Sequence, residues 1–298
     1  MQILLSILLA TIPALIWGGI FYKKNPVSRK KAKQTFILGM LAVTPILLYK
    51  WSWKYIPGLN INNYLDSLQV NLLAFAPAFY LPLGTVLLFM FVGVIEEYMK
   101  HLVVKKVDQG FFRNIDDAIE FSIISALGFA FIENSLYLYY IWEYQGLNVL
   151  LVSFVFRAIF STFAHVLFSG VYGYFYGIAY FADPIWSEEV RRSRYPLVNA
   201  IHAIFHFKRN RIFATEKVTE GLVLAIVLHA GFNILLEMNQ TFFMVPFLVF
   251  GYGLLDQLFK RKENLKAYGY LTGDYSEGHF HNRLWRKLHR KAPVSQID

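Results

Sequence analysis

The chain has 298 residues, of which 56% are hydrophobic and only 16% are charged. This composition excludes an ordinary soluble domain and favours a protein that crosses the membrane several times. The absence of cysteine excludes disulfides and thiolate ligands, so any metal would be bound by histidine and carboxylate. The net charge of +9 comes from basic residues spread over loops beside apolar segments. Because these residues form no nucleic-acid-binding motif, we expect no nucleic-acid partner.

The apolar segments predict an all-α, polytopic transmembrane helical bundle of about seven spans that forms a single membrane domain, residues 1–298. In chain order, the predicted spans are residues 3–21, 36–49, 72–104, 115–140, 149–181, 218–236 and 242–259. We expect Pro77 and Pro82 to break the outer end of the third span. The lipid bilayer is therefore the first partner that the sequence predicts.

The distribution of lysine and arginine predicts the orientation of these spans. Basic loops follow the first, third and fifth spans, and a basic tail, residues 260–298, follows the seventh. The turn at residues 143–146 has no basic residue, and residues 197–207 show the pattern of a short interfacial helix. The positive-inside rule then predicts an N-terminus outside and a C-terminus in the cytoplasm, in the plasma membrane.

Polar residues inside the predicted spans fall on four consecutive helices. The adjacent carboxylates Glu96 and Glu97 are the least expected, because an ionised residue at the centre of a membrane helix costs about 2.5 to 3.5 kcal/mol. Spacings of four residues put members of each group on one helix face, so all four groups can meet in one cavity. Span by span, they are Glu96, Glu97 and Lys100; Glu133, Asn134 and Tyr137; Arg157, Ser161 and His165; and His229 and Asn233.

Carboxylates, two histidines and an asparagine in one cavity are the components of a hydrolase that activates water. A desolvated glutamate can take a proton from water, His165 can orient or share that proton, and His229 with Asn233 can donate to a developing oxyanion. The same set could instead bind zinc through Glu96, Glu133, His165 and His229. Spacing alone does not separate the metal-free mechanism from the zinc mechanism.

Four motifs, in this order on successive predicted helices, resemble those of the PrsW intramembrane proteases, which are related to the CAAX prenyl endopeptidases and the bacteriocin-immunity-type membrane proteases. The resemblance covers residues 72–259, which we take as a protease-like core. The motifs are Glu96-Glu97-Tyr98-Met99-Lys100, Glu133-Asn134-Ser135-Leu136-Tyr137, Arg157 through His165, and His229-Ala230-Gly231-Phe232-Asn233.

The resemblance implies an endopeptidase that acts on membrane-anchored proteins, such as an anti-sigma factor. By position, Glu96 and Glu97 supply the catalytic carboxylate and its support, His165 partners the water, and His229 with Asn233 forms the oxyanion-binding pair. The first motif ends in Lys100, where CAAX enzymes carry an arginine one position later, so we expect protein spans rather than prenylated tails as substrates. The supporting residues are Lys100, Glu133, Asn134, Tyr137 and Arg157.

Two other functions use the same residues. A proton-coupled transporter or channel could employ the buried glutamate, histidine and arginine side chains as a relay. Such transporters often contain internal repeats with paired broken helices, and the two halves of this sequence show no such symmetry. The other alternative is a noncatalytic membrane scaffold, against which the complete set of motif residues argues.

Overall fold

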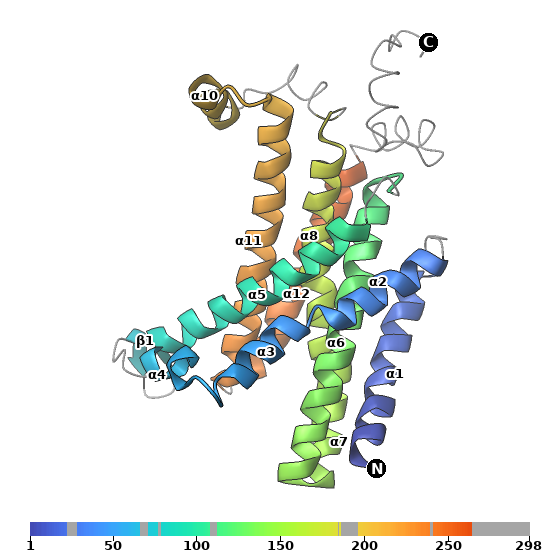
Figure 1. Ribbon diagram of the computed structural model, residues 1–298, viewed down its shortest axis with the longest axis vertical. Helices are drawn as coiled ribbons and strands as arrows, with labels where there is room; N and C mark the ends of the chain where they lie inside the picture. The colour runs from blue at the N-terminus through green and yellow to red at the C-terminus, as the bar shows by residue number, and fades with distance from the viewer. Residues whose placement is uncertain are drawn as a thin grey trace.

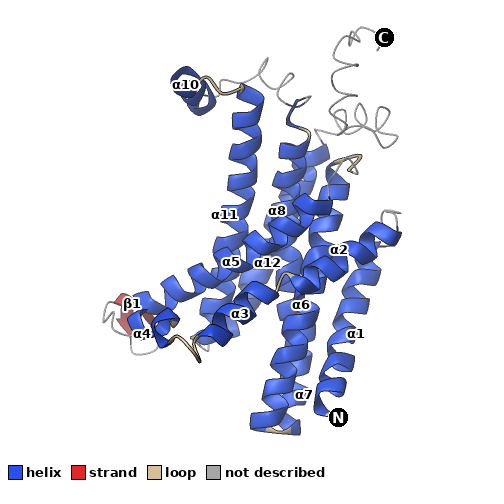
Figure 2. Cartoon of the chain, in the orientation of Figure 1, coloured by secondary structure: helices blue, strands red, loops and turns tan. Residues whose placement is uncertain are grey.

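The computed structural model describes residues 1–22, 29–65, 71–76, 79–107, 112–183, 185, 196–238 and 241–263. These residues are almost entirely helical, with one small β-hairpin (Figure 2). The elements are α1 (Gln2–Tyr22), α2 (Arg29–Leu41), α3 (Thr44–Ser52), η1 (Pro57–Leu59), α4 (Asn62–Leu65), β1 (Asn71–Ala76), β2 (Phe79–Pro82), α5 (Leu83–Val107), α6 (Ile115–Gln145), α7 (Leu147–Phe156), η2 (Arg157–Ser161), α8 (Thr162–Tyr180), α10 (Pro196–Phe205), α11 (Arg209–Glu237), η3 (Thr241–Phe243) and α12 (Met244–Glu263).

Helix α8 is the centre of the bundle. It packs between α6 and α11, while α1 and α2 cover another face of α6 and α12 lies behind α8 (Figure 1). Helix α5 slants across this layer and packs against α11 (Figure 1). The helices that carry the four polar groups of the sequence are therefore neighbours in space.

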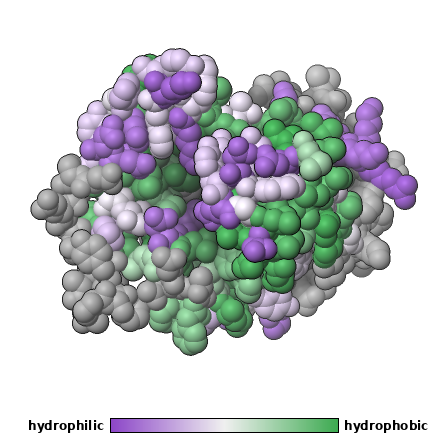
Figure 3. Space-filling view, turned by 90° about the horizontal axis from the view of Figure 1, so that it is seen from below, coloured by the Kyte–Doolittle hydropathy of each residue, from purple (hydrophilic) through white to green (hydrophobic). Residues whose placement is uncertain are grey.

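The outer surface of the bundle suits a membrane. Among the described residues, four helical segments are long and apolar enough to cross one, and they are Gln2–Gly19, Arg29–Ser52, Leu147–Tyr180 and Arg209–Glu237. Large apolar side chains such as Leu15, Val152 and Phe250 are exposed on them and on α12, and a broad hydrophobic surface borders hydrophilic patches in Figure 3. The chain is an all-α membrane protein, as predicted, while the number of spans and their orientation stay predictions.

Three predicted spans differ from the structure in their details. At the start of the third predicted span, residues 71–76 and 79–82 pair as the antiparallel strands β1 and β2, and the helix begins only at Leu83. The second predicted span is divided between α2 and α3 at Ala42 and Val43. In the fifth, the π-helical turn η2 separates α7 from α8. A helix is present as α10 where residues 197–207 predicted one, while its place at the membrane interface stays a prediction. Most of the predicted basic tail lies outside the described residues.

Helix α6 has a defined start and end because of two residues that flank it. Asn114 caps its first turn by accepting a hydrogen bond from the backbone N–H of Asp117 at 2.9 Å. Gly146, at φ 85°, ends the helix in a conformation that favours glycine and turns the chain into α7. This turn positions α6 and α7–α8 as an antiparallel pair, so Glu133 and His165 face each other.

Candidate active site

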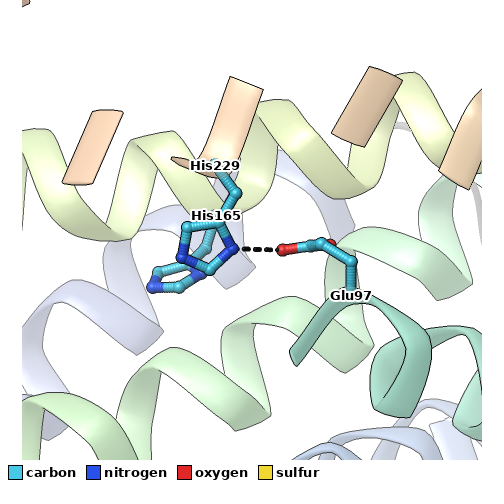
Figure 4. Close-up of side chains that lie close together, drawn as sticks. All are labelled: Glu97, His165 and His229. Carbon is cyan, nitrogen blue, oxygen red and sulfur yellow. Dashed lines mark hydrogen bonds and ion pairs between the residues drawn. The ribbon is translucent and has the colours of Figure 1, made fainter. Parts of the chain in front are cut away.

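The carboxylate of Glu97 joins α5 to α11. Its Oε1 accepts a hydrogen bond from His229 Nδ1 at 2.7 Å, drawn as the dashed line in Figure 4, and a second one from Lys100 Nζ at 2.7 Å. All three side chains are buried. The imidazole of His165 lies beside that of His229 with ring centroids 5.2 Å apart (Figure 4). A single carboxylate oxygen therefore holds two of the predicted site residues in place.

Lys100 also connects this pair to α8 and α6. Its Nζ lies 3.1 Å from His165 Nδ1, and His165 Nε2 lies 2.8 Å from Glu133 Oε2. Because an ammonium group can only donate, the proton of a neutral His165 belongs on Nε2, from which it is donated to Glu133. The chain of contacts from Glu97 through Lys100 and His165 to Glu133 thus has one consistent set of hydrogen-bond directions.

Arg157 anchors the other end of this chain. Its guanidinium pairs with Glu133 Oε2 at 3.0 Å, donates from Nε to Asn134 Oδ1 at 2.6 Å, and lies 4.1 Å from the centroid of the Tyr137 ring. Asn134 in turn donates to Thr162 Oγ1 at 3.0 Å. Arg157 begins the π-helical turn, a feature often found at functional sites.

Glu96 differs from Glu97 in having no such partners. Its Oε2 is buried and accepts no hydrogen bond from any residue in the described part of the chain. The nearest ionisable side chain is His229, whose Nε2 lies 3.5 Å from Glu96 Oε2. Since His229 donates its Nδ1 proton to Glu97, its Nε2 presents a lone pair towards Glu96. Glu96 is therefore the carboxylate in this cluster with an oxygen available to bind water.

The charges of the cluster leave a deficit of one positive charge. Three carboxylates, Glu96, Glu97 and Glu133, lie with two fixed cations, Lys100 and Arg157, among mostly buried side chains. With both histidines neutral, the net charge of these five side chains is −1. A net charge buried at membrane depth is costly, so a further proton or a metal cation in the cluster is favoured.

A metal ion has one suitable set of ligands in the described residues. Glu97, His165 and His229 are all buried and each offers a ligand atom, and these atoms lie within 4.8 Å of one another. One carboxylate and two imidazoles match the donors of a catalytic zinc site. Lys100 contacts two of the three residues, so its ammonium group must turn away before a divalent cation binds. The residues fit the metal in chemical type, with Glu97 in place of the Glu96 and Glu133 of the sequence-based set.

The structure brings most of the predicted residues together, with one exception. No described hydrogen bond joins Asn233 to the cluster, although it lies one helical turn from His229. The sequence left open which carboxylate of the adjacent pair meets Lys100, and in the structure it is Glu97, three residues before the lysine. Three further residues contact the cluster without having been predicted, namely Thr162, Phe168, which stacks on His229, and Phe129, whose ring lies under Lys100.

Replacing Arg157 by methionine should lower the free energy of unfolding by about 3 kcal/mol, because it leaves the Glu133 carboxylate without its cation. Adding Glu133→Gln in the same chain removes the uncompensated charge and should recover part of this loss. Thermal unfolding of the purified protein in detergent, measured for both single variants and the double variant, gives the coupling. Additive losses would show that the pair does not stabilise the fold.

Comparison with known proteins agrees with this geometry. A family model described as PrsW family intramembrane metalloprotease matches residues 28–255, which include every residue of the cluster. No curated protein and no solved structure matches the chain. Because the match extends over most of the chain, the protein belongs to the PrsW family of intramembrane metalloproteases.

Proposed function

We propose that the protein is an intramembrane endopeptidase that hydrolyses peptide bonds of membrane-anchored proteins, and that Glu96 activates the attacking water. The observation that carries this proposal is the buried, unpaired Oε2 of Glu96 beside the fully engaged pair of Glu97 and His229. In a membrane protease, a carboxylate with a free oxygen next to a histidine is suited to general-base catalysis. Membership of the family supports the reaction class.

The proposed reaction begins with the water at Glu96. Glu96 takes a proton as the water oxygen attacks the peptide carbonyl, and the proton passes to the leaving amine, directly or through His229 Nε2, 3.5 Å away. The tetrahedral intermediate needs hydrogen-bond donors. The amide of Asn233 has no described partner and can donate to the oxyanion. No covalent intermediate with the protein is required.

The remaining residues hold the reacting groups in place. Glu97 fixes the tautomer and orientation of His229 through the 2.7 Å hydrogen bond, and Lys100 neutralises Glu97. The contacts of His165 with Glu133, and of Glu133 with Arg157, fix α8 against α6. These residues act as positioning residues in the metal-free arrangement.

A metal ion that the family description implies would be held by Glu97, His165 and His229. When bound, it would polarise the peptide carbonyl and lower the pKa of a bound water. The role of Glu96 is the same with and without the ion, since it is the carboxylate outside this ligand set.

We further propose a single membrane domain, residues 1–298, with residues 72–259 as the protease core, seven spans, an external N-terminus and a cytoplasmic C-terminus in the plasma membrane. The basic residues Lys105, Lys106 and Arg209 then lie on the cytoplasmic side. Single-spanning or anchored proteins, including anti-sigma factors, are the proposed substrates.

The function is tested with the full chain in liposomes that also contain single-spanning reporter proteins and an internal pH dye. We expect reporter fragments on gels without a proton flux that depends on this protein. A proton flux with intact reporters would support the transporter instead.

The same preparation is analysed for zinc. If Glu97, His165 and His229 bind the ion, we expect about one zinc ion per chain and loss of cleavage on chelation. Full cleavage by a metal-free preparation would contradict the metal site and leave the proposed peptidase function in place.

A further inference from the structure

Helices α5 and α11 cross beside the active site. The two helices are in close contact at Gly93, where an added Cβ would lie 3.3 Å from the Ile226 carbonyl oxygen. From this crossing they diverge towards the C-terminal end of α5 and the N-terminal end of α11 (Figure 1). Glu97 and His229 meet about one helical turn from this crossing.

A pocket of about 480 Å³ lies among the diverging ends of the two helices and α8. Tyr176 and Ala179 of α8 contribute to its lining, with His101 and Lys105 from α5 and Arg211 from α11. The pocket and the active site are therefore built on the same three helices. A polypeptide that extends along α5 would pass from one to the other.

The cationic groups of this pocket outnumber its acidic groups. Lys105 and Arg211 are exposed, and neither has a carboxylate partner among the residues that the structure describes. The one acidic residue of the lining, Asp183, accepts a hydrogen bond from Asn210, and His101 is hydrogen-bonded to the Tyr172 hydroxyl. Two cations without a carboxylate partner among the described residues therefore line the pocket, which favours an anionic occupant.

The spacing along α5 places the pocket relative to the bond that is cut. Lys105 follows Glu97 by eight residues, which corresponds to about 12 Å along a helix. An extended polypeptide covers this distance with about four residues, at about 3.3 Å each. A substrate side chain about four residues from the cleaved bond would thus reach the pocket.

We propose that this pocket binds an acidic side chain of the substrate, aspartate or glutamate, about four residues from the cleaved bond on its cytoplasmic side. The inference rests on the proposed peptidase function. Lys105 and Arg211 form charge-assisted hydrogen bonds to the carboxylate and thereby fix the register of the unwound segment over Glu96. An anionic lipid headgroup could satisfy the same charges, but the position of Lys105 on the same helix as Glu97, eight residues further on, favours the substrate.

The test uses a library of single-spanning reporter proteins in which the residues on both sides of the apolar segment are randomised. The library is placed in liposomes of neutral lipid with the full-length protein, and mass spectrometry identifies each cleaved bond. We expect aspartate and glutamate to be enriched about tenfold at three to five residues on the cytoplasmic side. The Lys105→Gln, Arg211→Gln double variant should lose this enrichment and still cut the reporters, whereas Lys106→Gln, next to the pocket, should keep it.

The outcomes separate this proposal from the function on which it rests. Cleavage by the wild type without positional enrichment of acidic residues overturns the pocket assignment and leaves the peptidase in place. No cleavage of any reporter overturns the proposed function. If cleavage instead rises on adding anionic lipid, equally for acidic and neutral reporters, and the double variant loses that response, the pocket binds a lipid headgroup and the proposal is wrong. If the Lys105→Glu, Arg211→Glu double variant enriches lysine instead of acidic residues at this substrate position, the result would support the proposal directly.

Discussion

Replacing Glu96 by glutamine should reduce the rate of reporter cleavage about 10³-fold, because the amide cannot take a proton from water. The same substitution should leave the thermal unfolding temperature nearly unchanged, since Glu96 Oε2 accepts no hydrogen bond from the described residues and the side-chain volume is preserved. Cleavage is measured on gels with the variant and the wild type in identical liposomes. This combination of lost activity and retained stability is what distinguishes a general base from a structural residue.

The matched control for this substitution is Glu143→Gln near the end of α6, where the carboxylate is exposed and makes none of the contacts described for the cluster. We expect full activity from this control. Substantial cleavage by Glu96→Gln would contradict the assignment of the base. A large loss of stability in Glu96→Gln would show instead that the carboxylate is part of the structural ion pairs.

Replacing Glu97 by glutamine should abolish cleavage and also destabilise the protein by about 3 to 5 kcal/mol. The reason is that Lys100 is left as a buried cation without its ion-pair partner. His229 also loses the carboxylate that orients it, so the geometry at Glu96 is disturbed as well. Thermal unfolding and reporter cleavage measured on the same preparation give both effects.

A double variant separates the two consequences of losing Glu97. Adding Lys100→Met to Glu97→Gln removes the uncompensated cation and should restore much of the stability. Activity should stay absent, because His229 is still without its partner. A double variant that regains cleavage together with stability would mean that Glu97 contributes to the fold alone.

Much of the site could be predicted because ionisable residues are rare in apolar segments. Glu96, Glu133, His165 and His229 each stand out in a predicted span, and four consecutive helices of one bundle can bring them together. The structure does so, although each helix contributes from a different point along its length. The sequence could not show which carboxylate of the adjacent pair meets Lys100, since spacings of three and four residues both lie on one helix face.

Two features of the fold were not predictable from hydropathy. Residues 71–76 and 79–82 are apolar enough to continue a membrane helix, yet they pair as strands, because an apolar run by itself does not distinguish helix from strand. The π-helical turn at Arg157 inserts one residue into the helical repeat and changes the face on which Arg157 lies relative to His165.

Hydrolysis by a water that Glu96 activates is tested most directly by the oxygen that enters the product. The purified wild-type protein and a single-spanning reporter are incubated in liposomes in ¹⁸O-labelled water, and mass spectrometry examines the new chain ends. This mechanism predicts a new amino terminus and a new carboxyl terminus that carries one solvent oxygen, with the cut within or beside the apolar segment, and neither end with Glu96→Gln. The mechanism would be contradicted if Glu96→Gln formed the new ends as well as the wild type does. It would also be contradicted if the wild type formed no new ends with any reporter.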